Sequence, residues 1–334
     1  NLIFIINFLT RRFAHDWKLL LSIFAGILLS SMLVSGAPIF LDSLERITLN
    51  TAIDRSSQTY LNISIFTSTL PSGNDKISHA DLNVKGAIER NVSEFYSGEI
   101  EYLKGGLSLI ETPNRPLSKA GKEFTTRGYF HSLSELENHV HFVSGRNSES
   151  GVEGNDDSSP TPTVEVLISS HNANSLGIVI GDQLIVTPSL IDPSLVIANV
   201  VGIIEASDPL DPYWQKNHDI IMRPVPVEDP PGTWSALSEH WSLGTRIKVD
   251  PREPPLHLFV KRSDMTNVIG NAFPSSFLSA TWIIEVDKHG MKQFDPHELA
   301  SKLSKLDADL TEELPGASVF SGTTSLLRQF ERRS

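Results

Sequence analysis

The sequence predicts an α+β fold in which an N-terminal interfacial helix and one transmembrane helix precede a mixed α/β extracytoplasmic domain with a smaller inserted lobe. Three observations predict it. A long uncharged stretch lies near the N-terminus, short strand-like runs alternate with amphipathic helices after it, and 40% of the residues are hydrophobic, enough for a sizeable core. The length of 334 residues fits two domains, or one domain with a membrane element.

The uncharged stretch is Leu19–Leu41. As a helix it would be roughly 34 Å long, which exceeds a hydrocarbon core of about 30 Å. Arg11, Arg12 and Lys18 precede the stretch, and positive residues remain on the cytoplasmic side of a membrane. We therefore expect a helix that spans the cell membrane, with a cytoplasmic N-terminus and residues 42–334 outside.

Two neighbouring features bear on this interpretation. Ser35-Gly36-Ala37 has the small residues of a cleavage site, so a cleaved signal peptide is the alternative. Against it, the apolar run is longer than such peptides need, and Pro38 would become the first mature residue.

Residues 1–18 alternate apolar and polar faces at helical spacing, which predicts an interfacial amphipathic helix or a cytoplasmic extension of the same helix. Membrane lipid is therefore an expected partner.

Charge and cysteine content exclude several classes of function. The net charge is −12, and an acidic chain lacks the basic face that nucleic acid requires, so no nucleic-acid partner is expected. The sequence has no cysteine, which excludes disulfides, thiolate nucleophiles and cysteine-ligated zinc.

Strands and helices are expected to alternate along the rest of the chain. The predicted strands are Tyr60–Thr69, Glu99–Ile110, Val164–Ser169, Gln183–Thr187, the central strand Leu195–Glu205 and the edge-type strand Thr281–Asp287. The predicted helices start at the capping box of Ser78, cover Ser170–Leu176, start at the N-cap Asp295, and cover Thr324–Arg333. A Gly-, Ser- and Asp-rich loop is expected over 145–162, and an irregular Pro- and Trp-rich insertion over 207–256.

These elements give the expected domain boundaries. They are an interfacial helix 1–18, a transmembrane helix 19–41, an extracytoplasmic core domain 42–206, a second lobe 207–293 and C-terminal helices 294–334.

One short segment carries a specific turn prediction. Leu176 ends a short helix, and Gly177 follows it where helices commonly adopt a positive φ. Gly181 and Asp182 then turn the chain into the strand 183–187, with the Asp182 carboxylate accepting nearby backbone N–H groups.

Nucleotide-binding and hydrolase motifs are absent from the sequence. The nearest match to a phosphate-binding loop, Gly121-Lys122, lacks the preceding glycine and the following hydroxyl residue. Neither H-E-x-x-H nor G-x-S-x-G occurs. We therefore expect no catalytic residue, no bound cofactor and no enzyme activity in this chain.

The best candidate metal ligands are His131, Glu135, His139 and His141. On a helix, the side chains at 131, 135 and 139 would share one face, which suits metal ligation. The intervening apolar residues complete an ordinary amphipathic pattern, so the alternative is a helix whose histidines face the solvent. An anchored hydrolase that uses this cluster is the third functional class to consider.

Three aromatic residues of the insertion, Tyr213, Trp214 and Trp234, form either a contact surface for an extracytoplasmic partner or an attachment of the insertion to the core.

Several motifs together resemble the FtsX-like and MacB-like permeases of ABC transporters. In that family a segment ending in Gly-Arg precedes a variable loop, a strand, a helix with a Leu-Gly-x-x-x-Gly-Asp turn, and a strand ending in Val-Gly-Ile. The corresponding residues are Gly145-Arg146, Val164–Ile168, Leu176-Gly177 with Gly181-Asp182, and Val201-Gly202-Ile203.

This resemblance implies a permease subunit with a MacB-like periplasmic core domain. A separate ATPase subunit would hydrolyse ATP inside the cell, and a permease dimer would transmit the movement to the outer domain, so that an extracytoplasmic substrate is moved. The family has four membrane helices, whereas this chain begins with Asn and has one stretch of spanning length. Truncation before a second membrane helix is therefore expected. The alternative is a single-pass protein whose outer domain binds a ligand or partner, as in a sensor or adaptor.

Overall fold

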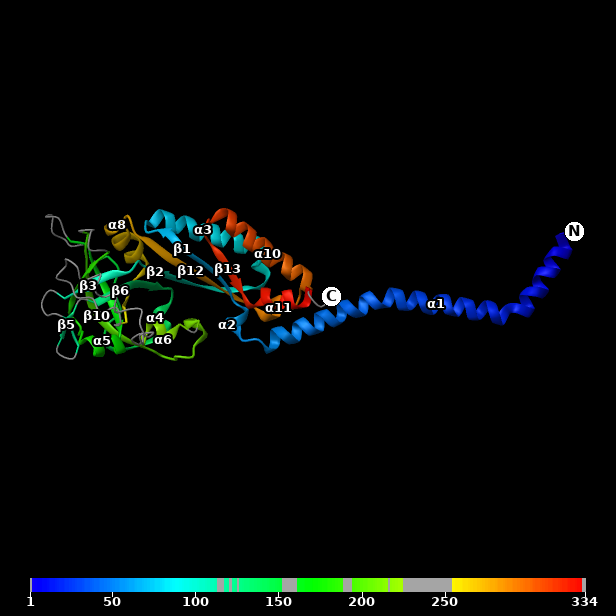
Figure 1. Ribbon diagram of the computed structural model, residues 1–334, viewed down its shortest axis with the longest axis horizontal. Helices are drawn as coiled ribbons and strands as arrows, with labels where there is room; N and C mark the ends of the chain where they lie inside the picture. Colours follow the sequence, from blue (N-terminus) through cyan, green and yellow to red (C-terminus); the bar gives the residue numbers. More distant parts are fainter. Residues whose placement is uncertain are drawn as a thin grey trace, which may run out of the picture.

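The computed structural model describes residues 2–112, 117–119, 122–124, 126–151, 161–188, 194–215, 217–224 and 254–331. Strands and helices are mixed along the chain, which confirms the α+β class. A long N-terminal helix, α1 (Leu2–Arg55), projects from one end of a sheet-rich body (Figure 1). By length and hydropathy, none of the helices in these described ranges meets the requirements of a membrane span, so the transmembrane prediction is unconfirmed.

The main sheet of the described residues has eleven strands. They are β1 (Ile63–Pro71), β2 (Tyr96–Lys104), β3 (Ser108–Glu111), β6 (Thr126–Leu133), β7 (Val140–Gly145), β8 (Thr163–Ser169), β9 (Gln183–Thr187), β10 (Val196–Ala206), β11 (Leu256–Phe259), β12 (Phe277–Val286) and β13 (Ser318–Ser321). A separate hairpin pairs β4 (Leu117–Lys119) with β5 (Lys122–Phe124).

The helices after α1 range from single turns to five turns. They are α2 (Gln58–Leu61), α3 (Asn74–Asn91), η1 (Ser93–Phe95), α4 (Leu136–His139), α5 (Ser170–Leu176), η2 (Pro212–Trp214), α6 (His218–Ile221), η3 (Asp264–Ile269), α8 (Gly270–Ala272), α9 (Lys288–Met291), α10 (Pro296–Glu313) and α11 (Gly322–Glu331).

Six strands close into a small barrel. Their pairing order is β11-β8-β10-β9-β3-β6, and β6 pairs in parallel with β11 to complete the ring. Closure pairs the edges of these strands with one another. We call β3, β6, β8, β9, β10 and β11 the barrel.

The remaining strands extend from the barrel as a flatter sheet. β6 also pairs with β2, and the order continues β2-β12-β1-β13, which we call the four-stranded sheet. The helices α3 and α10 pack against each other, and α3 also contacts β1 (Figure 1). The barrel strand β6 therefore joins the barrel to the four-stranded sheet through its pairing with β2.

The start of α10 follows from its sequence as predicted. Asp295 is the N-cap and accepts a hydrogen bond from the Glu298 N–H at 2.8 Å, and Pro296 stands in the first turn, where it loses no helical bond. The apolar face of α10 is buried in the core; its members are Leu299, Leu303, Leu306 and Leu310.

Three predicted boundaries are wrong. α3 begins at Asn74 rather than at Ser78, because Ile77 is fully buried and docks the preceding turn on the core. The single strand predicted over 99–110 is divided between two strands, the end of β2 and most of β3. The strand predicted to start at Tyr60 starts at Ile63.

β12 was expected at an edge but lies between β1 and β2. An antiparallel strand with one face on the core and one toward solvent alternates wherever it stands in the sheet, so alternation does not identify an edge.

Two strands of the predicted second lobe, β11 and β12, pair within the main sheet. The boundary expected between 206 and 207 stays a prediction. Residues 225–253, with Trp234, and residues 152–160 of the expected loop lie outside the described ranges.

Candidate functional site

The last turns of α1 are built into the core of the body. Leu49 and Ile53 are fully buried and belong to the main hydrophobic cluster, together with residues of β1, α3 and α10. Burial of two large aliphatic side chains contributes about 1.5–3 kcal/mol each. The end of α1 therefore moves with the sheet and does not swing as a separate tail.

Polar contacts reinforce this attachment from the turn after β12. Lys288 donates from Nζ to the Ser56 carbonyl at 2.6 Å, Lys292 pairs with Asp54, and Gln58 donates to the Val286 carbonyl at 2.6 Å. We call Leu49–Leu61 with residues 286–293 the joint.

The C-terminal helix reaches the same place. α11 packs against α1 and α2, and the Thr323 hydroxyl donates to the Leu61 carbonyl at 3.3 Å. Figure 1 shows the described end of the chain beside the entry of α1. The chain thus enters and leaves the body at one end, and the barrel lies at the other.

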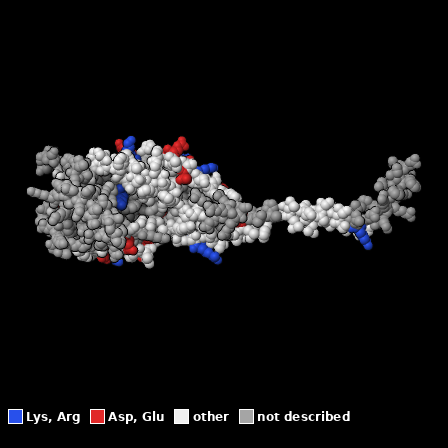
Figure 2. All heavy atoms as spheres, viewed as in Figure 1, with Lys and Arg blue, Asp and Glu red and all other residues white. Residues whose placement is uncertain are grey.

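Beyond the joint, α1 presents an apolar surface. Every side chain from 21 to 36 is exposed and uncharged, and the large ones include Phe24, at 62%, and Val34, at 76%. Figure 2 shows this part of the helix free of charged atoms. Soluble surfaces rarely expose so continuous an apolar stretch, and larger patches mark contact with a membrane or a protein.

The turn predicted after Leu176 is confirmed. Gly177 has φ +65° and ends α5, and the Ile178 N–H donates to the Ala173 carbonyl at 2.9 Å. Gly181 has φ +88°, and the Asp182 carboxylate accepts from the Val179 N–H at 2.9 Å. The turn docks on β10, because the Gly181 N–H donates to the Val200 carbonyl at 2.8 Å.

Gly177→Val should destabilise the whole body, because a β-branched residue at positive φ costs on the order of 1 kcal/mol or more. Asp182→Ala should cost about 1 kcal/mol for the lost hydrogen bond. Urea melts of the full chain measure both. A Gly177→Val protein that melts like wild type contradicts the assignment of Gly177 as a conformational requirement.

The Gly145-Arg146 pair forms a close crossing with β10. Gly145 has φ +82°, and a Cβ there would lie 2.2 Å from the Val201 carbonyl oxygen. A Cβ on Gly202 would lie 2.4 Å from the Arg146 carbonyl oxygen, so the two glycines permit the same contact from opposite sides.

Arg146 forms an ion pair with Glu165 that the sequence analysis did not predict. Its guanidinium donates to both carboxylate oxygens of Glu165 on β8, at 2.5 and 2.7 Å. The Glu149 N–H donates to the same carboxylate at 2.8 Å. Hydrogen bonding to Arg146 lowers the pKa of Glu165, whose side chain is largely buried. The start of the loop after β7 is thereby fixed to the barrel.

The expected histidine helix does not exist. His131 lies in β6 and is fully buried, Glu135 precedes α4 at φ +58°, His139 ends α4, and His141 lies in β7. His139 lies 2.7 Å from an Asp211 carboxylate oxygen, and His141 lies 3.4 Å from Glu205. No three His, Asp or Glu side chains within the described ranges form a group that could hold a metal.

Two of the three insertion aromatics attach it to the core. Tyr213 and Trp214 are 5% and 2% exposed, so the contact-surface interpretation is wrong for them. Tyr213 stacks on His139 with ring centroids 3.7 Å apart and donates to the Ser134 carbonyl at 2.9 Å.

His131 belongs instead to a buried hydrogen-bonded chain. Its Nδ1 lies 2.6 Å from the Tyr102 hydroxyl on β2, and its Nε2 lies 2.6 Å from Nδ1 of His257 on β11. His257 Nε2 is buried and has no hydrogen-bond partner among the described residues. Burial lowers the pKa of His131, and it lowers the pKa of His257 to about 4. Both rings are therefore neutral at pH 7.

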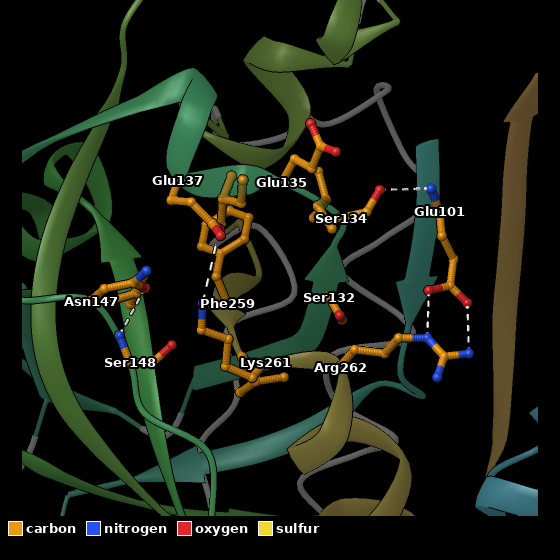
Figure 3. A pocket seen from close by; sticks show the side chains of 14 residues that line it. Glu101, Ser132, Ser134, Glu135, Glu137, Asn147, Ser148, Phe259, Lys261 and Arg262 are labelled. Carbon is orange, nitrogen blue, oxygen red and sulfur yellow. Dashed lines mark hydrogen bonds and ion pairs between the residues drawn. The ribbon is translucent and has the colours of Figure 1, made fainter. Parts of the chain in front are cut away.

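A pocket of about 170 Å³ opens where the barrel meets the four-stranded sheet. Figure 3 shows Arg262, which follows β11, reaching to Glu101 of β2. Arg262 donates from Nε to the Glu101 carboxylate at 2.6 Å and also pairs with Asp81 of α3. Burial raises the pKa of Glu101, and Arg262 opposes that shift. Arg262 thus links the barrel, the sheet and the helix layer.

No protein-family model and no curated protein matches the sequence. Among solved structures, the fold resembles the extracellular domain of the noncanonic ABC-type transporter YknZ from Gram-positive bacteria. The identity is 9%, the TM-score is 0.35, and the alignment covers 77% of this chain and 100% of that domain. A likeness at this level does not establish shared function.

Proposed function

We propose that this chain is the permease-type subunit of an ABC transporter, anchored in the cell membrane by α1. The observation that carries the proposal is the continuity of α1 from the exposed apolar residues 21–36 into the core at Leu49 and Ile53. A helix fixed to the body by the joint would pass its movement to the sheet and then to the barrel. No residue of this chain need be catalytic.

The proposed partners follow from this arrangement. A separate ATPase subunit would act inside the cell, a second permease copy would complete the dimer, and an extracytoplasmic substrate or protein would meet the barrel. The position of α11 beside α1 supports the proposal, because a second membrane segment would then start next to the first.

Membrane anchoring and orientation are tested together by cysteine labelling, since the chain has no cysteine of its own. Leu210, which is 90% exposed, is changed to Cys, and Asn7 is changed to Cys in a separate variant. In intact cells a membrane-impermeant maleimide should label Leu210→Cys and leave Asn7→Cys unlabelled. Both proteins should remain in the membrane fraction after a carbonate wash.

The opposite labelling pattern, or release of the protein by carbonate, would overturn the anchored arrangement. The choice between a permease and a single-pass sensor needs the adjoining DNA. Three further apolar segments downstream and a neighbouring ATPase gene would support the permease. A stop codon after Ser334 or a cytoplasmic kinase segment would overturn it.

A further inference from the structure

Two nearly buried serines, Ser132 and Ser148, line the pocket of Figure 3. Their exposed fractions are 4% and 5%. The Ser148 N–H donates to the Asn147 side chain, but neither serine hydroxyl has a hydrogen-bond partner within the described part of the chain. A polar group withdrawn from bulk water costs free energy unless water or a ligand satisfies it.

Other lining groups add hydrogen-bond donors. The Ser134 oxygen accepts from the Glu101 N–H at 2.9 Å, which leaves its own O–H to donate. Lys261 Nζ lies 3.9 Å from the Glu137 carboxylate, too far for a hydrogen bond, so its donors are also available. Three hydroxyls and an ammonium group therefore line one pocket, where they offer hydrogen-bond donors to an anionic oxygen.

Carboxylates stand at the edge of the same pocket. Glu101 is paired with Arg262, but the exposed Glu135 and Glu137 are not held by a guanidinium. Figure 3 shows both above Ser132 and Lys261 in that view. These two carboxylates would attract a positively charged group of a ligand. A negatively charged group of the same ligand would then meet the donors deeper in the pocket.

We propose that this pocket binds a small zwitterion of the amino-acid class. The volume of about 170 Å³ equals roughly five or six water molecules at 30 Å³ each, which accommodates a small amino acid. The ligand carboxylate lies against Ser132, Ser148 and Lys261, and its ammonium group faces Glu137. The site joins segments of the barrel and of the four-stranded sheet, and it does not depend on the proposed membrane function.

Isothermal titration of the full chain with L-alanine tests this site, with acetate and methylammonium as single-charge probes. Alanine should bind saturably, and each single-charge probe should bind at least about tenfold more weakly, since it forms only half of the contacts. Lys261→Gln should abolish alanine binding, and Ser132→Ala should weaken it about tenfold. Lys305→Gln, on α10, is the matched control and should bind like wild type.

Thermal midpoints without ligand show whether each variant is folded. Absence of saturable alanine binding by the wild-type chain would overturn the proposal. Acetate that binds as tightly as alanine would overturn the zwitterion assignment, and a folded Lys261→Gln protein with unchanged affinity would remove the site from this pocket.

Discussion

Gly202→Val is expected to prevent the body from folding, and Gly202→Ala to destabilise it by on the order of 3 kcal/mol. A Cβ at this position would lie 2.4 Å from the Arg146 carbonyl oxygen and 2.8 Å from a Leu167 methyl group. Gly202 stands in β10 between β7 and β8, where Gly145 and Leu167 are its direct neighbours. A backbone oxygen cannot rotate away as a side chain can, so one of the two strand pairings must open.

Gly106→Ala is the matched control for this experiment. Its Cβ would meet only the Phe277 carbonyl oxygen, at an ordinary 3.8 Å, so the free energy of unfolding should change by less than about 1 kcal/mol. Denaturant melts of both alanine variants give the comparison. Equal stability of the two would show that β7 and β8 do not approach β10 as closely as described.

The segments that the sequence predicted correctly are those whose determinants lie within a few residues. The αL end of α5 at Gly177, the turn at Asp182 and the N-cap of α10 at Asp295 each depend on one side chain and its immediate neighbours. Local signals of this kind survive in any tertiary context that keeps the element.

The features of the fold that the sequence did not predict depend on contacts between strands that are distant in sequence. The barrel closes through β6 and β11, and the His131–His257 contact joins positions 126 residues apart. Arg262, which lines the pocket, pairs with Asp81 across 181 residues. Nothing in a short window specifies these pairs.

The histidine error shows the same limit. The polar residues between 131 and 141 fit a solvated helix face by spacing alone. In the fold, this part of β6 pairs with β11 and His131 is fully buried, so tertiary packing overrides the local pattern. Two partners from other strands, the Tyr102 hydroxyl on β2 and His257 on β11, accommodate the imidazole there.

Acidification from pH 7 to pH 5 is expected to destabilise the protein through this histidine pair. In the unfolded chain both rings titrate near pH 6.5, whereas in the fold burial lowers the pKa of His257 to about 4 and lowers that of His131 as well. Well above pH 6.5 both imidazoles are neutral in the folded and in the unfolded chain, so their titration does not lower the free energy of unfolding. As the pH falls, only the unfolded chain gains protons, so His257 removes about 2 kcal/mol by pH 5 and His131 acts in the same direction.

The groups around the pair favour this direction. Lys104 stands near both rings and disfavours a further positive charge. Tyr102, which stacks on His131, stays neutral in this range because burial raises the pKa of its hydroxyl. Glu99 and Glu101 act in the opposite direction, since burial raises their pKa and their protonation favours the fold. The carboxylates with lowered pKa values, such as Glu165, titrate below pH 4.5 and contribute little above pH 5.

Replacing one ring isolates the effect. His257→Phe should lower the free energy of unfolding at pH 7, because His131 loses its partner, and it should reduce the loss between pH 7 and pH 5 by about 2 kcal/mol. His297→Gln, at an exposed position of α10, should leave the pH dependence unchanged. Urea melts at pH 7, 6 and 5 measure the slopes. If His257→Phe keeps the wild-type slope, the folded protein already accepts a proton at this pair, and His131 and His257 are not held neutral by burial.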